Sequence, residues 1–283
     1  MKRKPDVVVI SDTHLGTYGC HAKELLVYLR SVDPSILILN GDIIDIWNFS
    51  KSWFPKSHMQ VIRQILKMAE RGCRVYYITG NHDEALRKYE GTTLGNLHLE
   101  DKLILSLDGS IVWFFHGDIF DATTKGWAKI LAKSGGKGYD LLILINRLIN
   151  RVLEGIGREK MSFSKKVKSS VKKAVQWINN FEMTAAELAA DQDFDVVVCG
   201  HIHQPEKRMI ETSKGKILYM NSGDWVENCT SLEYSGGNWQ IHTFNDKIEK
   251  HETDTEDDVA ATPKVNKDLL ENFIFSDTNQ III

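Results

Sequence analysis

Near the start of the chain, residues 7–14 read VVVISDTH, an apolar run followed after one serine by Asp12 and His14. An apolar run this short is typical of a buried strand. Four further apolar runs are followed by polar motifs, namely Gly41-Asp42, Gly80-Asn81-His82-Asp83, His116-Gly117-Asp118 and Gly200-His201-Ile202-His203. Because an α/β sheet places its ligands at the ends of its strands, we expect the motifs to converge on one edge.

The first half of the chain alternates strand and helix. Amphipathic stretches at residues 22–29 and 61–69 separate the first three apolar runs, which is typical of parallel strands with helices on the faces of the sheet. Residues 97–115 and 195–244 instead indicate short strands, with turns at Asp108-Gly109, Lys214-Gly215 and Gly236-Gly237. We predict an α/β fold over residues 1–245, in which two sheets form a β-sandwich flanked by helices.

A different kind of sequence lies at residues 121–193, between the fourth and fifth motifs. It contains an apolar helical stretch at residues 139–149, a basic one at 165–175 and a third helical stretch at 175–190. Long insertions at the functional edge of a sheet are commonly lids or substrate platforms, and we predict that role here. The alternative is a helical hairpin that only packs on the core.

The composition limits the partners and the compartment. Residues 246–283 are acidic and polar apart from an apolar end, which predicts a flexible tail. The four cysteines show no paired spacing, and the first apolar run is too short for a signal peptide, so we expect a cytoplasmic protein. The formal net charge of −3 argues against a general nucleic-acid binder. Contact with a membrane surface and the oligomeric state are left open.

The residue types in the five motifs suit a site for two divalent metal ions. Such ions, held about 3.5–4 Å apart, clamp a phosphate and lower the pKa of bound water from 15.7 to about 7. Carboxylates, imidazoles and an amide oxygen are fitting ligands for them. Asp42, at the end of the second run, suits a bridging position. The predicted ligands are Asp12, His14, Asp42, Asn81, His116, His201 and His203.

His82 is predicted to act on the substrate. It lies between Asn81 and Asp83, so it can face the phosphate while a carboxylate orients its ring. We assign His82, Asn81 and Asp83 to the catalytic group, with His82 protonating the leaving oxygen. Taken alone, any one motif is commonly a turn or a surface accident, and His116 alone can be a core histidine. Five such motifs in order, each after a strand signal, favour the site.

This ordered set of motifs resembles the calcineurin-like metallophosphoesterases, from Val7 to about Tyr234. The resemblance implies a β-sandwich with flanking helices and a dinuclear metal site. It also implies how the ligands are shared, with Asp42 in both groups: one ion takes Asp12, His14, Asp42 and His203, and the other takes Asp42, Asn81, His116 and His201. A non-catalytic scaffold of the same fold is a remote alternative, because such a scaffold is expected to lose a ligand or His82.

A narrower resemblance is to the bacterial UDP-2,3-diacylglucosamine hydrolases. It is carried by Asp12-Thr13-His14-Leu15-Gly16, by the insertion after His116-Gly117-Asp118, and by Asn221-Ser222-Gly223-Asp224-Trp225. It implies a phosphorylated, lipid-linked substrate of lipid A biosynthesis, cleaved at its pyrophosphate at the inner membrane surface with release of UMP. It also implies two Mn²⁺ ions as cofactors, although the ligand types would admit iron or zinc.

The sequence leaves two substrate classes open. Those hydrolases usually carry arginine at the position of His82, so a different ester, including a soluble phosphodiester or phosphomonoester, is the alternative. The apolar and basic stretches of the insertion would suit an acylated substrate or an anionic membrane surface. We expect substrate contacts from Trp47, Lys165, Lys168 and Lys172. The alternative is that these residues belong to packed and solvated helices of no special role.

Overall fold

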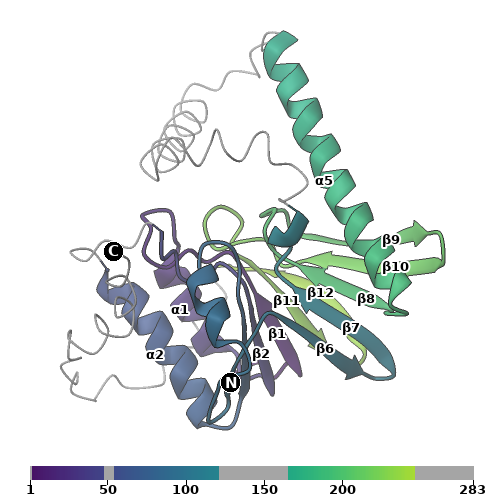
Figure 1. The fold of residues 1–283 in the computed structure, drawn as a ribbon. Coiled ribbons are helices and arrows are strands. Elements are labelled where there is room, and N and C mark those ends of the chain that lie inside the picture. The colour runs from purple at the N-terminus through teal and green to yellow at the C-terminus, as the bar shows by residue number, and fades with distance from the viewer. Residues whose placement is uncertain (1, 48–53, 121–164, 246–283) are drawn as a thin grey trace, which may run out of the picture. The chain divides into compact units, whose positions relative to one another are not determined.

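Two mixed β-sheets pack face to face, and helices cover their outer faces (Figure 1). The computed structural model describes residues 2–47, 54–120 and 165–245, with the backbone alone for residues 165–176. The predicted fold class, an α/β sandwich of two sheets with flanking helices, is confirmed. Residues 121–164 of the predicted lid at 121–193 lie outside the described residues. The whole predicted tail at 246–283 lies outside them as well.

The first sheet has seven strands in the order β12-β11-β1-β2-β3-β5-β4. Its central strands β1, β2, β3 and β5 run parallel, while β4, β11 and β12 pair antiparallel with their neighbours. The strands are β1 (Val7–Ile10), β2 (Ile36–Asn40), β3 (Arg74–Ile78), β4 (Thr93–Leu94), β5 (Leu97–Glu100), β11 (Thr230–Ser235) and β12 (Asn238–Thr243).

The second sheet has five strands in the order β6-β7-β8-β10-β9. Here β7, β8 and β10 run parallel, and β6 and β9 close the two edges in antiparallel pairing. The strands are β6 (Lys102–Leu107), β7 (Ser110–Phe115), β8 (Val196–Cys199), β9 (Glu206–Thr212) and β10 (Gly215–Asn221).

The predicted hairpin turn at Asp108-Gly109 joins β6 to β7. Both residues have positive φ, 48° and 87°, as a two-residue turn between twisted antiparallel strands requires. The predicted turn at residues 236–237 likewise joins β11 to β12. The turn between β9 and β10 lies at residues 213–214, one residue earlier than expected, because Gly215 already begins β10.

Strand β1 is apolar at every position because both of its faces are covered. Alternate side chains of a strand point to opposite faces. Val8 and Ile10 pack against α1 (Ala22–Ser31) and α2 (Lys56–Glu70), whereas Val7 and Val9 pack against the second sheet. A short 3₁₀ helix, η1 (Glu84–Tyr89), follows the third motif.

Helix α5 (Lys165–Asp191) covers the outer face of the second sheet, where Ala185, Ala186 and Ala189 pack against β8 and β10. The sequence predicted two helical stretches meeting at Val175, which is wrong, because the structure has one continuous helix. Residues 165–191 contain neither glycine nor proline to interrupt it. Within the described residues, no helix combines the length and apolar character needed to cross a membrane.

Candidate metal centre

The five motifs lie on the loops that follow β1, β2, β3, β7 and β8. Backbone hydrogen bonds tie these loops together: Asp12 N donates to Gly41 O at 3.0 Å, His14 N to Asp42 O at 3.0 Å, and Gly200 N to His116 O at 3.0 Å. Two more bonds join the β3 loop and the second sheet to them, because His82 N donates to Asp42 Oδ1 at 2.8 Å and His201 N to Asp12 Oδ2 at 3.1 Å. Residues distant in the sequence, and from both sheets, therefore form one rim.

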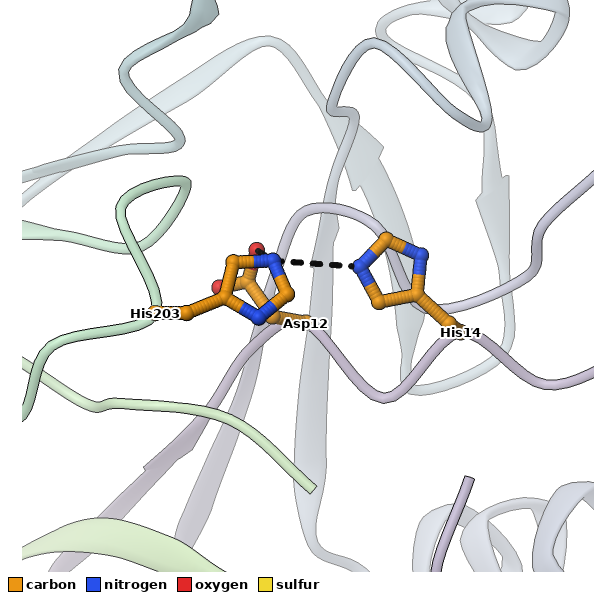
Figure 2. Close-up of side chains that lie close together, drawn as sticks. All are labelled: Asp12, His14 and His203. Carbon is orange, nitrogen blue, oxygen red and sulfur yellow. Dashed lines mark hydrogen bonds and ion pairs between the residues drawn. The ribbon is translucent and has the colours of Figure 1, made fainter. Parts of the chain in front are cut away.

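A first group of side chains consists of Asp12, His14 and His203, whose ligand atoms lie within 4.8 Å of one another. Figure 2 shows the imidazole rings of His14 and His203 side by side, each with a nitrogen atom pointing toward the other, and the carboxylate of Asp12 next to His203. The Nε2 atoms of the two histidines are 3.3 Å apart, and His203 Nε2 is 3.3 Å from Asp12 Oδ1. Three ligand atoms so close together suit one divalent ion.

A second group consists of Asp42, His116 and His201. Asp42 Oδ2 lies 3.3 Å from His116 Nε2 in this group and 4.0 Å from His14 Nε2 in the first. A single carboxylate oxygen thus lies between the two groups, which is the position that a bridging ligand needs. The sequence predicted this place for Asp42.

The backbone at these residues is unusual. Positive φ angles occur at Asp12 (51°), His14 (48°), Asp42 (55°), His201 (69°) and His203 (56°). Residues other than glycine rarely adopt this left-handed conformation, which costs free energy and clusters at functional sites.

The glycines of the motifs leave room for the ligands. A Cβ atom at Gly41 would lie 2.2 Å from His116 Nδ1, and one at Gly80 would lie 2.3 Å from Asp42 Oδ1. Real Cβ atoms do not approach other atoms so closely, so each ligand side chain lies directly against bare backbone.

Two of the ligand atoms are buried without a hydrogen bond from the described part of the chain. Asn81 Oδ1 has none, and His116 Nε2 has only the Asp42 carboxylate 3.3 Å away. Such burial is costly unless another group satisfies these atoms. The other ring nitrogen of His116 lies 3.0 Å from Asn40 O, and His203 Nδ1 lies 3.1 Å from Asp224 Oδ2. Metal-binding histidines commonly donate their second nitrogen in this way. The donor set therefore fits divalent ions.

Burial and charge perturb the same groups strongly. Burial alone would raise the pKa of Asp42, but the facing His116, with His14 and His82, holds it well below its ordinary value. Burial would lower the pKa of His203, but the Asp12 and Asp224 carboxylates raise it to about 9. Burial would raise the pKa of Asp224, yet His203 and backbone N–H groups lower it to about 2. Concentrated carboxylate charge of this kind attracts cations.

His82 lies at the edge of the two groups, but its carboxylate partner differs from the one we expected. His82 Nδ1 is 3.1 Å from Asp45 Oδ2. Asp83 is instead fully buried and accepts hydrogen bonds from Gly80 N, Ile43 N and the Tyr77 hydroxyl. The orienting role predicted for Asp83 is therefore corrected, because its oxygens are turned into the loop that they stabilise.

Asp45 and Asp224 are the residues that sequence reasoning missed. Asp45 contacts His82 and also lies 3.7 Å from His14 Nδ1, while Asp224 holds His203. Each had a sequence signal: Asp45 follows Asp42 by three residues, and Asp224 lies in the quoted stretch 221–225. Asp45 lies five residues after the end of β2, farther from its strand than the predicted ligands lie from theirs, whereas Asp224 follows β10 by three residues.

Aromatic side chains lie next to two histidines of the site. Trp47 packs on His82 with ring centroids 4.9 Å apart, yet it is 58% exposed. The ring centroids of Trp177 and Phe181 on α5 lie 6.4 and 6.2 Å from that of His201. The predicted substrate contacts Lys165, Lys168 and Lys172 lie in the first part of α5, where the side chains are outside the described residues.

Comparison with known proteins agrees with this geometry. The chain belongs to the calcineurin-like phosphoesterase family, whose model matches residues 5–205. Such membership makes it a metal-dependent phosphoesterase, so divalent ions are its cofactors.

Individual relatives are distant but similar over nearly their whole length. A UDP-2,3-diacylglucosamine hydrolase from Stenotrophomonas maltophilia is 22% identical, over 83% of this chain and 97% of its own. One from Blochmanniella pennsylvanica is 24% identical, over 83% of this chain and 94% of its own. The solved structure of an archaeal phosphodiesterase is 12% identical, over 84% of this chain and 98% of its own, with a TM-score of 0.37.

Proposed function

We propose that this chain hydrolyses a phosphoester or pyrophosphate bond with two metal ions, and that its substrate is UDP-2,3-diacylglucosamine or a similar nucleotide-linked glycolipid, from which it releases UMP. The observation that carries the proposal is the convergence of two Asp/His groups on either side of Asp42 Oδ2. In this proposal Asp42 belongs to both ions; one also takes Asp12, His14 and His203, and the other takes Asn81, His116 and His201.

We assign roles in the proposed reaction to His82 and Asp45 as well as to the ions. When bound, two such ions activate water and stabilise charge on the phosphate oxygens. His82 binds a phosphate oxygen and donates its proton to the leaving oxygen, and Asp45 holds the ring from the Nδ1 side. Burial alone would lower the pKa of His82, but the hydrogen bond to Asp45 and the charges of Asp42 and Asp45 raise it above its ordinary value. A raised pKa keeps the proton available for the leaving oxygen.

A lipid-linked substrate is supported by two independent facts. The relatives similar over most of this chain carry the name UDP-2,3-diacylglucosamine hydrolase. In addition, Trp47 beside His82 and Trp177 beside His201 offer apolar surface next to charged groups. Such a mixture suits a molecule with both a phosphate and apolar groups.

The acyl chains of such a substrate also suggest where the protein works. We place its action at the cytoplasmic side of a bacterial inner membrane, because an acylated substrate resides there in the lipid. Mn²⁺ is the proposed metal, with iron and zinc as alternatives that the same ligand types accept.

A second candidate is a soluble phosphodiester or phosphomonoester. The observation that favours it is His82 itself, which stands where arginine is usual in the lipid hydrolases that the sequence resembles.

The test compares both substrates directly. Purified protein with Mn²⁺ is given UDP-2,3-diacylglucosamine or an aryl phosphodiester, and release of UMP or of the aryl alcohol is measured. His82→Ala is expected to lower turnover by about 10²–10⁴-fold, the usual contribution of a general acid. His98→Ala serves as the matched control, since His98 lies on β5 and contacts Thr93 and Tyr76.

The outcomes separate the two candidates. UMP release from the lipid that depends on His82 supports the glycolipid. Cleavage of the aryl ester alone rejects the glycolipid and keeps the metal site. An aryl phosphomonoester is assayed in the same way. No cleavage of any of the three substrates by protein that holds two ions would reject a hydrolase of these substrate classes.

A further inference from the structure

One residue of the fourth motif has no place in the proposed chemistry. Asp118 follows His116 and Gly117, and only 12% of its side chain is exposed. It accepts a hydrogen bond from Arg87 Nη2 at 2.9 Å. Arg87 belongs to η1, the short helix that begins directly after Asn81-His82-Asp83.

Arg87 makes further contacts at the junction of the two sheets. Its Nε atom lies 2.7 Å from Asp101 Oδ1 and 3.3 Å from Thr79 Oγ1. Thr79 follows β3 of the seven-stranded sheet, and Asp101 lies between β5 of that sheet and β6 of the five-stranded sheet. Asp118 follows β7 of the five-stranded sheet. One guanidinium therefore connects loops from both sheets at the edge that carries the site.

This connection spans two ligands of the same proposed ion. Asn81 is carried by the loop after β3 and His116 by the loop after β7, so the distance between them depends on how the two sheets meet. Arg87 lies four to six residues after Asn81, His82 and Asp83 in the sequence. It also contacts Asp118, which lies two residues after His116. The planar, forked guanidinium is suited to holding two carboxylates at a fixed separation.

We propose that Arg87 is a positioning residue for the second ion, acting through Asp118 and Asp101 to hold the Asn81 loop against the His116 loop. The first ion depends less on this link, because Asp12, His14 and His203 lie on the loops after β1 and β8. The inference rests on the proposed dinuclear site and concerns binding of the metal rather than the identity of the substrate.

The experiment measures metal binding without any substrate. Metal-free full-length protein is dialysed against a series of Mn²⁺ concentrations, and bound manganese per chain is determined by mass spectrometry. In Arg87→Ala the dissociation constant of one ion is expected to rise about 10- to 100-fold, the usual cost of losing a partner that orients a ligand, while the other ion is bound as in the wild type. Arg87→Lys should recover part of the loss, because a lysine reaches one carboxylate but not both.

Controls separate positioning from a general loss of structure. Arg63→Ala removes an exposed arginine from α2 and should leave both ions unaffected. Asp118→Asn, which retains the Arg87–Asp101 pair, should weaken the same ion as Arg87→Ala and replaces that variant if it does not fold. If Arg87 and Asp118 act together, the double variant Arg87→Ala/Asp118→Asn should bind this ion only slightly more weakly than the weaker-binding of the two single variants.

The possible results are distinct. Equal weakening of both ions, or wild-type binding by Arg87→Ala, would overturn the positioning role while leaving the proposed hydrolase intact. A wild-type protein that binds only one ion would instead overturn the dinuclear site, and with it the premise of this inference.

Discussion

At the scale of single residues, three of the predicted ligands are held by a second polar group. Asn40 O lies against His116, Asp224 holds His203, and the carboxylate of Asp12 accepts a hydrogen bond from His201 N at 3.1 Å. Because a ligand must be oriented as well as present, these partners are expected to matter for metal affinity nearly as much as the ligands do. The catalytic candidate His82 follows the same rule through Asp45.

Replacing Asp45 by asparagine should move the pH profile of turnover. The Asp45 carboxylate raises the pKa of His82 by favouring its protonated form. A general acid must be protonated to act, so activity falls as the pH rises through its pKa. Asp45→Asn removes the charge and lowers that pKa, and the alkaline limb of kcat is therefore expected at lower pH than in the wild type. Asp33→Asn, at an exposed position, is the control; an unshifted limb in Asp45→Asn would contradict the pairing.

Gly80→Ala should empty the site without a large change elsewhere. The added Cβ would lie 2.3 Å from Asp42 Oδ1 and 2.7 Å from His116 Cδ2, so both side chains must move. Bound manganese per chain, measured by mass spectrometry, is expected to fall below that of the wild type. Gly91→Ala is the matched comparison, because it places a methyl group at a positive φ of 79° with no atom within 4 Å. If Gly80→Ala binds as much manganese as the wild type, the loop can accommodate a Cβ atom at residue 80 without displacing Asp42 and His116.

At the scale of elements, helix α5 is part of the site as well as part of the core. Phe181 lies so close to Gly117 that a Cβ atom there would be 2.6 Å from its ring. Its ring also faces Phe120 at 5.2 Å and His201 at 6.2 Å. The helix therefore packs directly on the loops that carry two predicted ligands, so the position of α5 and the shape of the site depend on each other.

Phe181→Ala should destabilise the protein by about 3–5 kcal/mol, because a buried phenylalanine leaves a cavity that its neighbours fill only partly. The free energy of unfolding, measured in urea on metal-free protein, tests this. Met183→Ala, at a residue of the same helix that is 44% exposed, is expected to change it by only about 0.5 kcal/mol. A similar cost for both variants would mean that α5 is held mainly by contacts other than Phe181.

At the scale of the whole molecule, the two sheets supply the predicted ligands together. Asp12, His14, Asp42 and Asn81 follow strands of the seven-stranded sheet, and His116, His201 and His203 follow strands of the five-stranded sheet. Both proposed ions would then be held by ligands from both sheets, so metal binding and the packing of the sheets are linked.

Metal removal should consequently lower the stability of the whole protein. A ligand at 100 times its dissociation constant stabilises the folded state by about 2.7 kcal/mol, and two sites add their effects. We expect the urea midpoint to rise with Mn²⁺ and to fall on chelation. The rise should be lost in Asp42→Ala, since Asp42 Oδ2 lies between the two groups. An equal rise in Asp42→Ala would place the stabilising ions elsewhere.

Much of the fold and of the candidate site could be predicted from the chain alone. The apolar runs ending at residues 10, 39, 78, 115 and 198 mark five strands of the structure, because a strand covered on both faces needs no polar position. The motif residues after these runs meet on one rim, as expected from strands that run parallel. The functional roles of these residues stay predictions.

Other features were beyond local pattern. The continuous helix from 165 to 191 was divided at Val175 because a change from basic to apolar composition resembles a boundary. Asp83, the neighbour of His82 in sequence, was expected to orient the His82 ring, whereas in the structure the ring contacts Asp45. Side-chain direction on a loop depends on backbone angles that sequence spacing does not specify.

The sequence by itself therefore determined which residue types follow which strands, and hence that carboxylates, imidazoles and an amide gather at one edge. Those features are local, since each depends on one apolar run and the few residues after it. Only the tertiary structure decided which carboxylate faces which imidazole, and that Arg87 joins loops of both sheets. These pairings depend on left-handed backbone at the ligands and on the packing of one sheet against the other, which are properties of the folded chain as a whole.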